Sequence, residues 1–217
     1  MGYLPDGSGK PYGFKGAHFM KNVTWEEPEE HTYNLFLEKK VTENGLDIRS
    51  YDPEFNFIQD DTVVEGEFQD EKYWGKHLYK IKKWLEVEPI EIPDDVCVIG
   101  FRGGEYSVFP ELFLTKDYWD EAIQMMKEID PDMKFEVHTD DPVLAKQFFP
   151  DYPVIADMEI NWRSVRYAKR AIIANSSFFI LPRLLNGGYT IAPRYWARRN
   201  IQTWAMPCNY YPGFKYI

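Results

Sequence analysis

Residues 96–106 read Val-Cys-Val-Ile-Gly-Phe-Arg-Gly-Gly-Glu-Tyr. The run from Val96 to Ile99 is apolar and mostly β-branched, which is typical of a parallel strand with both faces covered. Open α/β sheets bind ligands at the carboxyl ends of their strands, so we expect function in the residues that follow this one. Arg102 offers donors suited to phosphate, and the two glycines after it allow close backbone approach or a positive φ. The alternative interpretation is a strand-end turn with a surface ion pair between Arg102 and Glu105.

Short apolar runs alternate with amphipathic segments of helical period from Val96 onward. The predicted strands after the first are Lys134–His138, Pro153–Ala156, Ala171–Ala174 and Tyr189–Ala192. The predicted helices are Lys116–Ile129, Pro142–Phe148, Trp162–Lys169 and Phe178–Leu185. This alternation is typical of βαβ units, so we predict an α/β fold with a parallel, Rossmann-like sheet and right-handed crossovers.

The preceding residues predict a smaller and less regular α/β portion. Residues 1–35 are rich in Gly and Pro and are expected to be mostly loops. Farther on, the pattern predicts a strand at Thr62–Phe68 and an amphipathic helix at Glu71–Val87. We therefore predict two domains, residues 1–92 and residues 93–217, of which the second is a Rossmann-like domain with an aromatic C-terminal tail.

The charge of the chain is unevenly distributed. The 217 residues carry a formal net charge of −10, which argues against a general nucleic-acid binder. From Asn161 to Ile217, however, there are nine Lys or Arg residues and no Asp or Glu. This basic segment is either a local anion site or a solvated face that pairs with the acidic part of the chain. Arg163, Arg166, Lys169 and Arg170 lie on successive turns of a predicted helix, where they either frame a phosphate group or, as we expect, form such a solvated face.

Cysteine use and hydropathy give expectations about location. Cys97 and Cys208 match no metal-binding or redox spacing, and Cys97 is expected to be a small core residue. No apolar run is long enough to span a membrane, and the first residues lack the apolar segment of a signal peptide. We expect a reducing, cytoplasmic location and no membrane span.

Polar side chains follow several of the predicted strands. Asp140 and Asp157 are candidates for holding the base or sugar of a nucleotide, although Asp140, followed by Asp and Pro, also fits a helix cap. Ser176 and Ser177 precede a predicted helix, where they either bind a phosphate or act as an ordinary N-cap. His138 lies within a strand and is expected to be packed rather than catalytic.

Five motifs follow one another between about Val63 and Trp196. They are Gly66-Glu-Phe-Gln-Asp-Glu-Lys-Tyr-Trp74, Phe101-Arg-Gly-Gly-Glu-Tyr106, His138-Thr-Asp-Asp141, Ile173-Ala-Asn-Ser-Ser-Phe178 and Ala192-Pro-x-x-Trp196. Their order resembles the α-1,2-fucosyltransferase family, glycosyltransferase family 11. The first motif is similar to that family's Gly-Tyr-Phe-Gln-Ser-Glu-Lys-Tyr-Phe segment.

The resemblance implies a two-domain GT-B enzyme that transfers fucose from GDP-fucose to a glycan hydroxyl with inversion and without a metal ion. In such an enzyme residues 1–92 would form the acceptor side and residues 93–217 the donor-binding domain. Arg102 carries over as a ligand of the donor phosphates and as a catalytic residue. An inverting transfer usually needs a general base, for which Glu105 and Asp157 are the candidates. The expected donor site comprises Arg102, Gly104, Asp140, Asp157, Asn175, Ser176, Ser177 and Phe178.

The chain departs from the family pattern at two places. The family's strand-end motif is His-x-Arg-Arg-x-Asp, whereas this chain has Gly100 for the His, Gly103 for the second Arg and Glu105 for the Asp. The family also opens with Gly-Gly-Leu-Gly-Asn-Gln-Met-Phe, which Met1 to Lys21 do not contain, so we expect an incomplete N-terminal portion. A non-catalytic, glycosyltransferase-like binding or structural module therefore stays open as the second interpretation.

Overall fold

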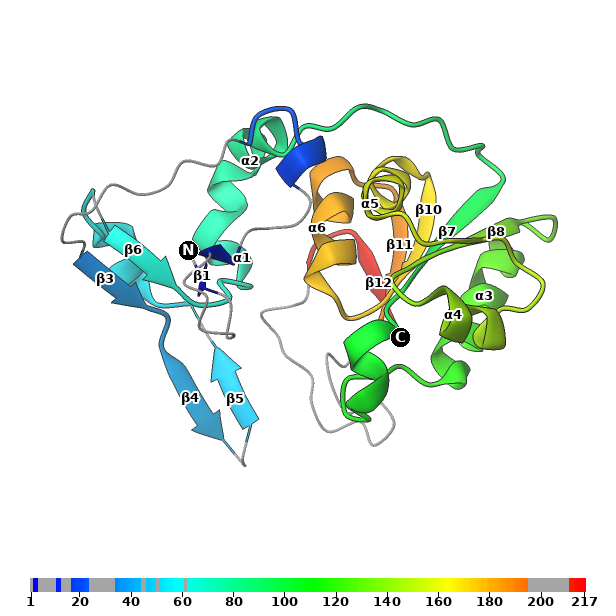
Figure 1. Ribbon diagram of the computed structural model, residues 1–217, viewed down its shortest axis with the longest axis horizontal. Helices are drawn as coiled ribbons and strands as arrows, with labels where there is room; N and C mark the ends of the chain where they lie inside the picture. The colour runs from blue at the N-terminus through cyan, green and yellow to red at the C-terminus, as the bar shows by residue number, and fades with distance from the viewer. Residues whose placement is uncertain are drawn as a thin grey trace. The chain divides into compact units, whose positions relative to one another are not determined.

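The computed structural model describes residues 2–3, 11–12, 17–23, 34–43, 46–49, 51–60, 62–194 and 211–217. The chain divides into two compact units, Met1–Glu86 and Val87–Ile217, whose elements are labelled in Figure 1. This division falls close to the boundary predicted between residues 92 and 93.

The larger unit contains a six-stranded sheet in which all neighbouring strands are parallel. Its strands are β7 (Val96–Phe101), β8 (Lys134–Thr139), β9 (Val154–Ile155), β10 (Arg170–Ile173), β11 (Tyr189–Ala192) and β12 (Phe214–Tyr216). Their order in space is β12-β11-β10-β7-β8-β9 (Figure 1). Numbered from β7, this is the 3-2-1-4-5-6 order of doubly wound nucleotide-binding folds. The predicted α/β fold with a parallel sheet is confirmed.

The C-terminal tail supplies the sixth strand, which the sequence patterns did not predict. Phe214–Tyr216 pairs in parallel with β11 at the edge of the sheet. The buried Tyr211 donates its backbone N–H to the hydroxyl of Tyr216, with a donor–acceptor distance of 2.6 Å. At least this part of the aromatic tail is thus a packed extension of the sheet.

In the described residues from β7 to β11, four α-helices connect the strands: α3 (Lys116–Ile129), α4 (Pro142–Phe148), α5 (Met158–Tyr167) and α6 (Ser177–Asn186). Helices α3 and α4 lie on one face of the sheet, and α5 and α6 pack together on the other (Figure 1). The predicted bounds of α3 and α4 are confirmed. Helix α5 starts at Met158 instead of Trp162, because Asp157 caps its first turn by accepting the N–H of Ile160 at 2.8 Å.

Strand β7 lies in the middle of the sheet, and both of its faces are covered. Phe101 points toward α3 and α4, where its ring lies 5.4 Å from that of Trp119 and 5.2 Å from that of Phe148. Gly100 points to the other face, where a Cβ atom would lie 2.7 Å from the Phe179 ring of α6. Each large apolar side chain buried in this way contributes roughly 1.5–3 kcal/mol to stability, which fixes the position and register of β7.

Arg183 of α6 is completely buried and ties α5 to β11. Its guanidinium donates to the carbonyl oxygens of Val165 at 2.9 Å and Ala168 at 2.7 Å, and to the hydroxyl of Thr190 at 2.8 Å. The first two acceptors belong to the C-terminal end of α5, where the helix dipole is negative. Burial lowers the pKa of Arg183 to about 10, so the side chain keeps its charge at neutral pH.

The described part of the smaller unit is built from short elements. Its three two-stranded sheets pair β1 (Gly2–Tyr3) with β2 (Pro11–Tyr12), β3 (Asn34–Leu37) with β6 (Thr62–Glu65), and β4 (Lys40–Glu43) with β5 (Leu46–Arg49). Its helices are the 3-10 turns η1 (Ala17–Phe19), η2 (Pro53–Phe57) and η3 (Gly75–His77) and the α-helices α1 (Glu71–Trp74) and α2 (Leu78–Trp84). The described residues of this unit include no second Rossmann-like sheet, so the GT-B arrangement stays a prediction.

The single helix predicted at Glu71–Val87 is wrong, because η3 interrupts it. Trp74 leaves the helical conformation, with φ at −129°, and its indole N–H donates to the carbonyl oxygen of Phe68 at 3.2 Å. Gly75, which follows, has little helix propensity to oppose the break. An apolar period alone did not reveal this interruption.

The strand predicted at Thr62–Phe68 is also shorter than expected and ends at Glu65. Phe68 has a positive φ of 47°, and its backbone N–H donates to the carboxylate of the buried Glu38 at 3.1 Å. Its ring packs edge-on against that of Tyr73, with centroids 5.1 Å apart. Tertiary contacts therefore override the strand propensity at this point.

Candidate functional site

The candidate site lies at the carboxyl ends of β7 and β10, the switch point at which the strand order of the sheet reverses. Strands β7 and β10 are neighbours, but the helices that follow them, α3 and α6, cover opposite faces. In open α/β sheets, the crevice outside such a switch point is where ligands bind. The segments that meet there are Arg102–Tyr106 after β7 and Ala174–Ser177 after β10, with Asp140 and Asp141 after the neighbouring β8.

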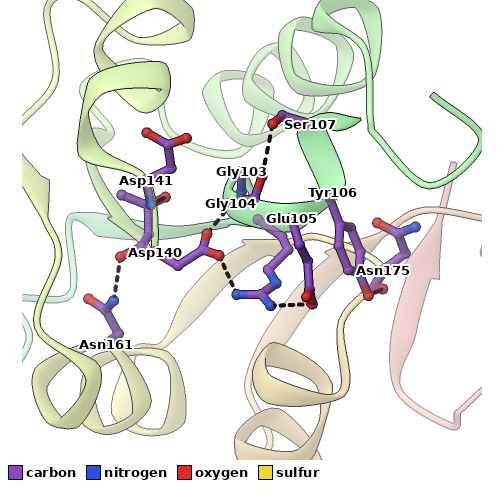
Figure 2. A network of polar contacts seen from close by, with 11 residues as sticks. Gly103, Gly104, Glu105, Tyr106, Ser107, Asp140, Asp141, Asn161 and Asn175 are labelled. Atoms are coloured by element: carbon purple, nitrogen blue, oxygen red, sulfur yellow. Dashed lines mark hydrogen bonds and ion pairs between the residues drawn. The ribbon is translucent and has the colours of Figure 1, made fainter. Parts of the chain in front are cut away.

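Arg102 has two carboxylate partners, Glu105 and Asp140, both of which are labelled in Figure 2. One terminal nitrogen pairs with Glu105 at 2.8 Å, and the other pairs with Asp140. The guanidinium also lies 5.3 Å from the ring centroid of Tyr106. The alternative predicted for Arg102, an ion pair with Glu105, is therefore present, and Asp140 adds a partner that the sequence did not indicate. Because a guanidinium has five N–H donors and its side chain is 26% exposed, Arg102 keeps donors for a ligand.

The Asp140 carboxylate lies beside the turn after β7 and hydrogen-bonds to it, as Figure 2 shows. Its second carboxylate oxygen accepts the backbone N–H of Gly103 at 3.0 Å. A Cβ atom on Gly103 would lie 2.7 Å from the Cβ of Asp141, and one on Gly104, where φ is 27°, would collide with the Asp140 carboxylate. Both glycines are therefore required by the close approach of the β8 loop. Asp141, and not Asp140, is the N-cap of α4, accepting the N–H of Leu144 at 3.0 Å.

Gly100 and Gly103 lie where the packing leaves no room for a side chain. The Phe179 ring fills the space beside Gly100, and the β8 loop fills the space beside Gly103. A side chain at either position would displace a neighbour.

Ser176 and Ser177 lie at the start of the ten-residue helix α6. Ser176 is the N-cap residue, yet its side chain makes no capping hydrogen bond, and only 5% of the residue is exposed. Ser177 is exposed to solvent. The hydroxyl groups are therefore not used as the side-chain cap that was the alternative interpretation, and the positive end of α6 faces the crevice.

Asn175 and Phe178 hold structure together at the same edge. The Asn175 side-chain amide donates to the carbonyl oxygen of Leu112 at 2.9 Å. The backbone carbonyl oxygen of Asn175 accepts a hydrogen bond from the Tyr106 hydroxyl at 3.4 Å. Asn175 thus fixes the long loop that follows β7 (Figure 2). The Phe178 ring packs edge-on against Trp162 of α5 at 5.5 Å, which orients it into the helix interface.

Asp157 is not brought together with Arg102. It follows β9, the edge strand, and acts as the N-cap of α5. Two strand spacings separate β9 from β7, which corresponds to about 10 Å. Of the two candidate general bases, the crevice therefore contains only Glu105, whose side chain is 66% exposed.

A buried polar chain beside the crevice was not predicted. His138 is fully buried, as expected, and its Nδ1 lies 3.0 Å from the Asn161 side-chain oxygen. The Asn161 amide donates to the carbonyl oxygen of Thr139 at 2.9 Å, directly before Asp140. His138 Nε2 hydrogen-bonds Glu136 at 2.8 Å, which lowers the pKa of that carboxyl. Glu136 and His138 alternate with apolar residues on β8, and this alternation was the sequence signal that could have indicated the buried polar chain.

The basic C-terminal segment mixes buried and exposed cations. Lys169 pairs with Asp94 at 2.6 Å, and Arg163 pairs with Glu159 at 2.9 Å, as expected of a face that pairs with acidic residues. The prediction is wrong for Arg166, which is only 2% exposed.

Comparison with protein-family models, curated proteins and solved structures finds no match to the chain. Among the described residues, no His, Cys, Asp and Glu side chains form a group of three or more that could hold a metal ion. No helix in the described ranges has the length and apolar character needed to cross a membrane.

Proposed function

We propose that the larger unit binds a nucleoside diphosphate sugar at the switch point and serves as the donor half of a glycosyltransferase. One observation carries the proposal: the 3-2-1-4-5-6 strand order places the segment after β7 beside the segment after β10. GDP-fucose as donor and a glycan hydroxyl as acceptor come from the sequence resemblance.

The diphosphate would bind between Arg102 and the N-terminus of α6. The Ser176 and Ser177 hydroxyls and the first N–H groups of the helix supply neutral donors, and Arg102 supplies the charge. The exposed pair between Arg102 and Glu105 is worth at most about 1 kcal/mol, so a phosphate can replace Glu105 there. Asp140 keeps the guanidinium in position during this exchange, because it is itself held by Gly103.

The exchange would also prepare the general base. When the acceptor oxygen bonds to C1 of fucose, the bond from C1 to the phosphate oxygen breaks, and GDP leaves with the electron pair. Arg102 stabilises the charge that develops on the leaving phosphate. The proton of the acceptor hydroxyl passes to the carboxylate of Glu105, which the donor phosphate has released from Arg102.

Calorimetric titration of the chain with GDP tests the proposal. Replacing Arg102 with Ala removes a charged hydrogen bond worth roughly 1.5–3 kcal/mol, so we expect at least about a tenfold loss of GDP affinity. Lys134→Ala is the matched control, since Lys134 is a cation paired with Asp95 at the opposite end of β8. Equal GDP affinity of the Arg102→Ala variant and the original chain would refute the phosphate role.

The second candidate is a non-catalytic module with the same architecture. It is favoured by the two carboxylates that already neutralise Arg102, and by Asp141 beside them. A module of this kind would show no GDP binding, or GDP binding without release or transfer of fucose from GDP-fucose. Transfer to a glycan acceptor, lost in Glu105→Gln, would exclude it.

A further inference from the structure

A second hollow lies between α3 and the turn after α4, on one face of the larger unit. Its volume is about 430 Å³, within the range of pockets that hold small molecules. Successive turns of α3 contribute Lys116, Asp120 and Gln124, and the segment after α4 contributes Asp151 and Tyr152. We call this hollow the α3–α4 groove. It is formed by helix surfaces, and none of the residues after β7 or β10 at the switch point lines it.

Several polar groups of the α3–α4 groove have no hydrogen-bond partner within the described part of the chain. They are the side-chain amides of Gln124 and Gln147, the carboxylate of Asp151 and the hydroxyl of Tyr152. The two amides each offer donors and an acceptor, the carboxylate only accepts, and the phenol does both. The groove thus presents a mixed set of donors and acceptors, of which only the carboxylate is charged, together with apolar lining residues that include Phe149.

The groove is rigid where the phenol lies. The Tyr152 ring stacks on Phe135, with centroids 5.2 Å apart, and on Phe149, with centroids 6.2 Å apart. Lys146 donates to the backbone oxygen of Tyr152 at 2.7 Å, which fixes the turn that carries it. Burial, and then the charge of Asp151, raise the pKa of Tyr152, so the hydroxyl keeps its proton. A ligand would meet a preorganised phenol there, which reduces the entropy lost on binding.

The charges of the groove balance one another. Lys116 pairs with Asp120 at 2.6 Å, and the remaining Asp151 is offset by Lys127 on the last turns of α3. An anionic ligand gains little where two carboxylates line the wall, and a cationic one gains little beside two lysines. A neutral molecule with many hydroxyl groups suits the unpaired amides, phenol and carboxylate best, because hydroxyl groups both donate and accept.

We infer that the α3–α4 groove binds a neutral oligosaccharide of two or three sugar units. Gln124, Gln147, Asp151 and Tyr152 bond its hydroxyl groups, and the apolar floor contacts its ring faces. The inference does not rest on the proposed donor site, because it uses none of that site's residues.

Titration of the isotopically labelled full chain with lactose, maltose, cellobiose and sucrose, followed by NMR amide shifts, tests the inference. At least one of these sugars is expected to give saturable shifts confined to α3 and residues 147–152. Tyr152→Phe removes only the hydroxyl and keeps the ring stacking, so it should weaken binding about threefold or more. Glu128→Gln, which removes an exposed carboxylate of α3 outside the groove, should leave it unchanged.

Three results would overturn the inference: no groove shifts with any of the four sugars, groove shifts with inorganic phosphate in their place, or sugar binding that Tyr152→Phe and Gln124→Met both leave intact. The readout is separate from that of the donor site, since GDP is expected to shift residues after β7 and β10 and not the groove. Failure of either proposal therefore leaves the other standing.

Discussion

Arg102 and Arg183 of the larger unit differ in their exposure to solvent and in the groups that their guanidinium groups contact. Arg102, at the carboxyl edge of the sheet, is partly exposed and pairs with two carboxylates. Arg183, between α5 and β11, is fully buried and donates to three carbonyl oxygens and a hydroxyl, none of them charged. A carboxylate on the surface can be exchanged for a phosphate, whereas backbone carbonyls at a helix end have no substitute. The first arrangement suits ligand binding, and the second suits permanent structure.

The largest expected effect follows from the buried member of this pair. Arg183→Met leaves the carbonyl oxygens of Val165 and Ala168 without their donor, so we expect a loss of roughly 3–5 kcal/mol in the free energy of unfolding. Arg102→Met removes only partly exposed ion pairs and should cost about 1 kcal/mol or less. Urea denaturation of both variants measures the difference. Equal losses would mean that the two arginines do not differ in the way described.

The turn that positions Arg102 gives the next prediction. Gly104→Ala places a Cβ against the Asp140 carboxylate in a backbone conformation that side chains rarely adopt. We expect a loss of about 1–3 kcal/mol in unfolding free energy, together with weaker GDP binding. Gly187→Ala is the control, since Gly187 also has a positive φ but meets no atom within 4 Å. If both variants lose the same stability and keep full GDP affinity, Asp140 does not organise the turn.

A smaller effect should come from the exchangeable partner. Glu105→Gln frees Arg102 from one carboxylate, so GDP affinity should rise, by up to about fivefold. Transfer of fucose should fall in the same variant, because the proposed base is gone. Calorimetry and a transfer assay on one preparation report both quantities. A fall in GDP affinity would show that Glu105 contributes to donor binding instead of competing with it.

The smallest effect concerns Glu136, whose partner is a buried histidine. The hydrogen bond from His138 lowers the carboxyl pKa below its ordinary value of 4.5. A carboxyl with a lowered folded-state pKa stabilises the protein above the unfolded-state value, and this contribution disappears as the pH falls through the folded-state value. Stability should therefore drop below about pH 4.5, and Glu136→Gln should flatten that part of the profile. Thermal unfolding at a series of pH values measures this profile. If Glu136→Gln left its acid part unchanged, the pairing of Glu136 with His138 would be contradicted.

Periodicity predicted the larger unit well because each of its elements buries a continuous face. Helix α3 and strand β11 have the predicted bounds, since a central parallel sheet imposes regular spacing on what covers it. The same reasoning failed at Glu71–Val87, where the Trp74 indole bonds a carbonyl oxygen outside the helix. A hydrogen bond from a helix side chain to the backbone just before the helix leaves no periodic signal, so a sequence pattern cannot indicate it.

The location of the candidate site was predictable from the sequence, but the contacts between its side chains were not. Arg102, Asp140, Ser176 and Ser177 were expected at one sheet edge because each follows a strand, and the strand order places them at or next to the switch point. The ion pair between Asp140 and Arg102 forms because β8 is the neighbour of β7, and only the fold establishes this strand pairing.

The central claim is that a nucleoside diphosphate binds between the ends of β7 and β10. The most direct test is a titration of the labelled chain with GDP, read from backbone amide shifts. We expect saturable shifts at Arg102–Tyr106 and Ala174–Phe178, with the amides of the sheet unchanged. Shifts confined to other regions, or none at saturating GDP, would contradict it.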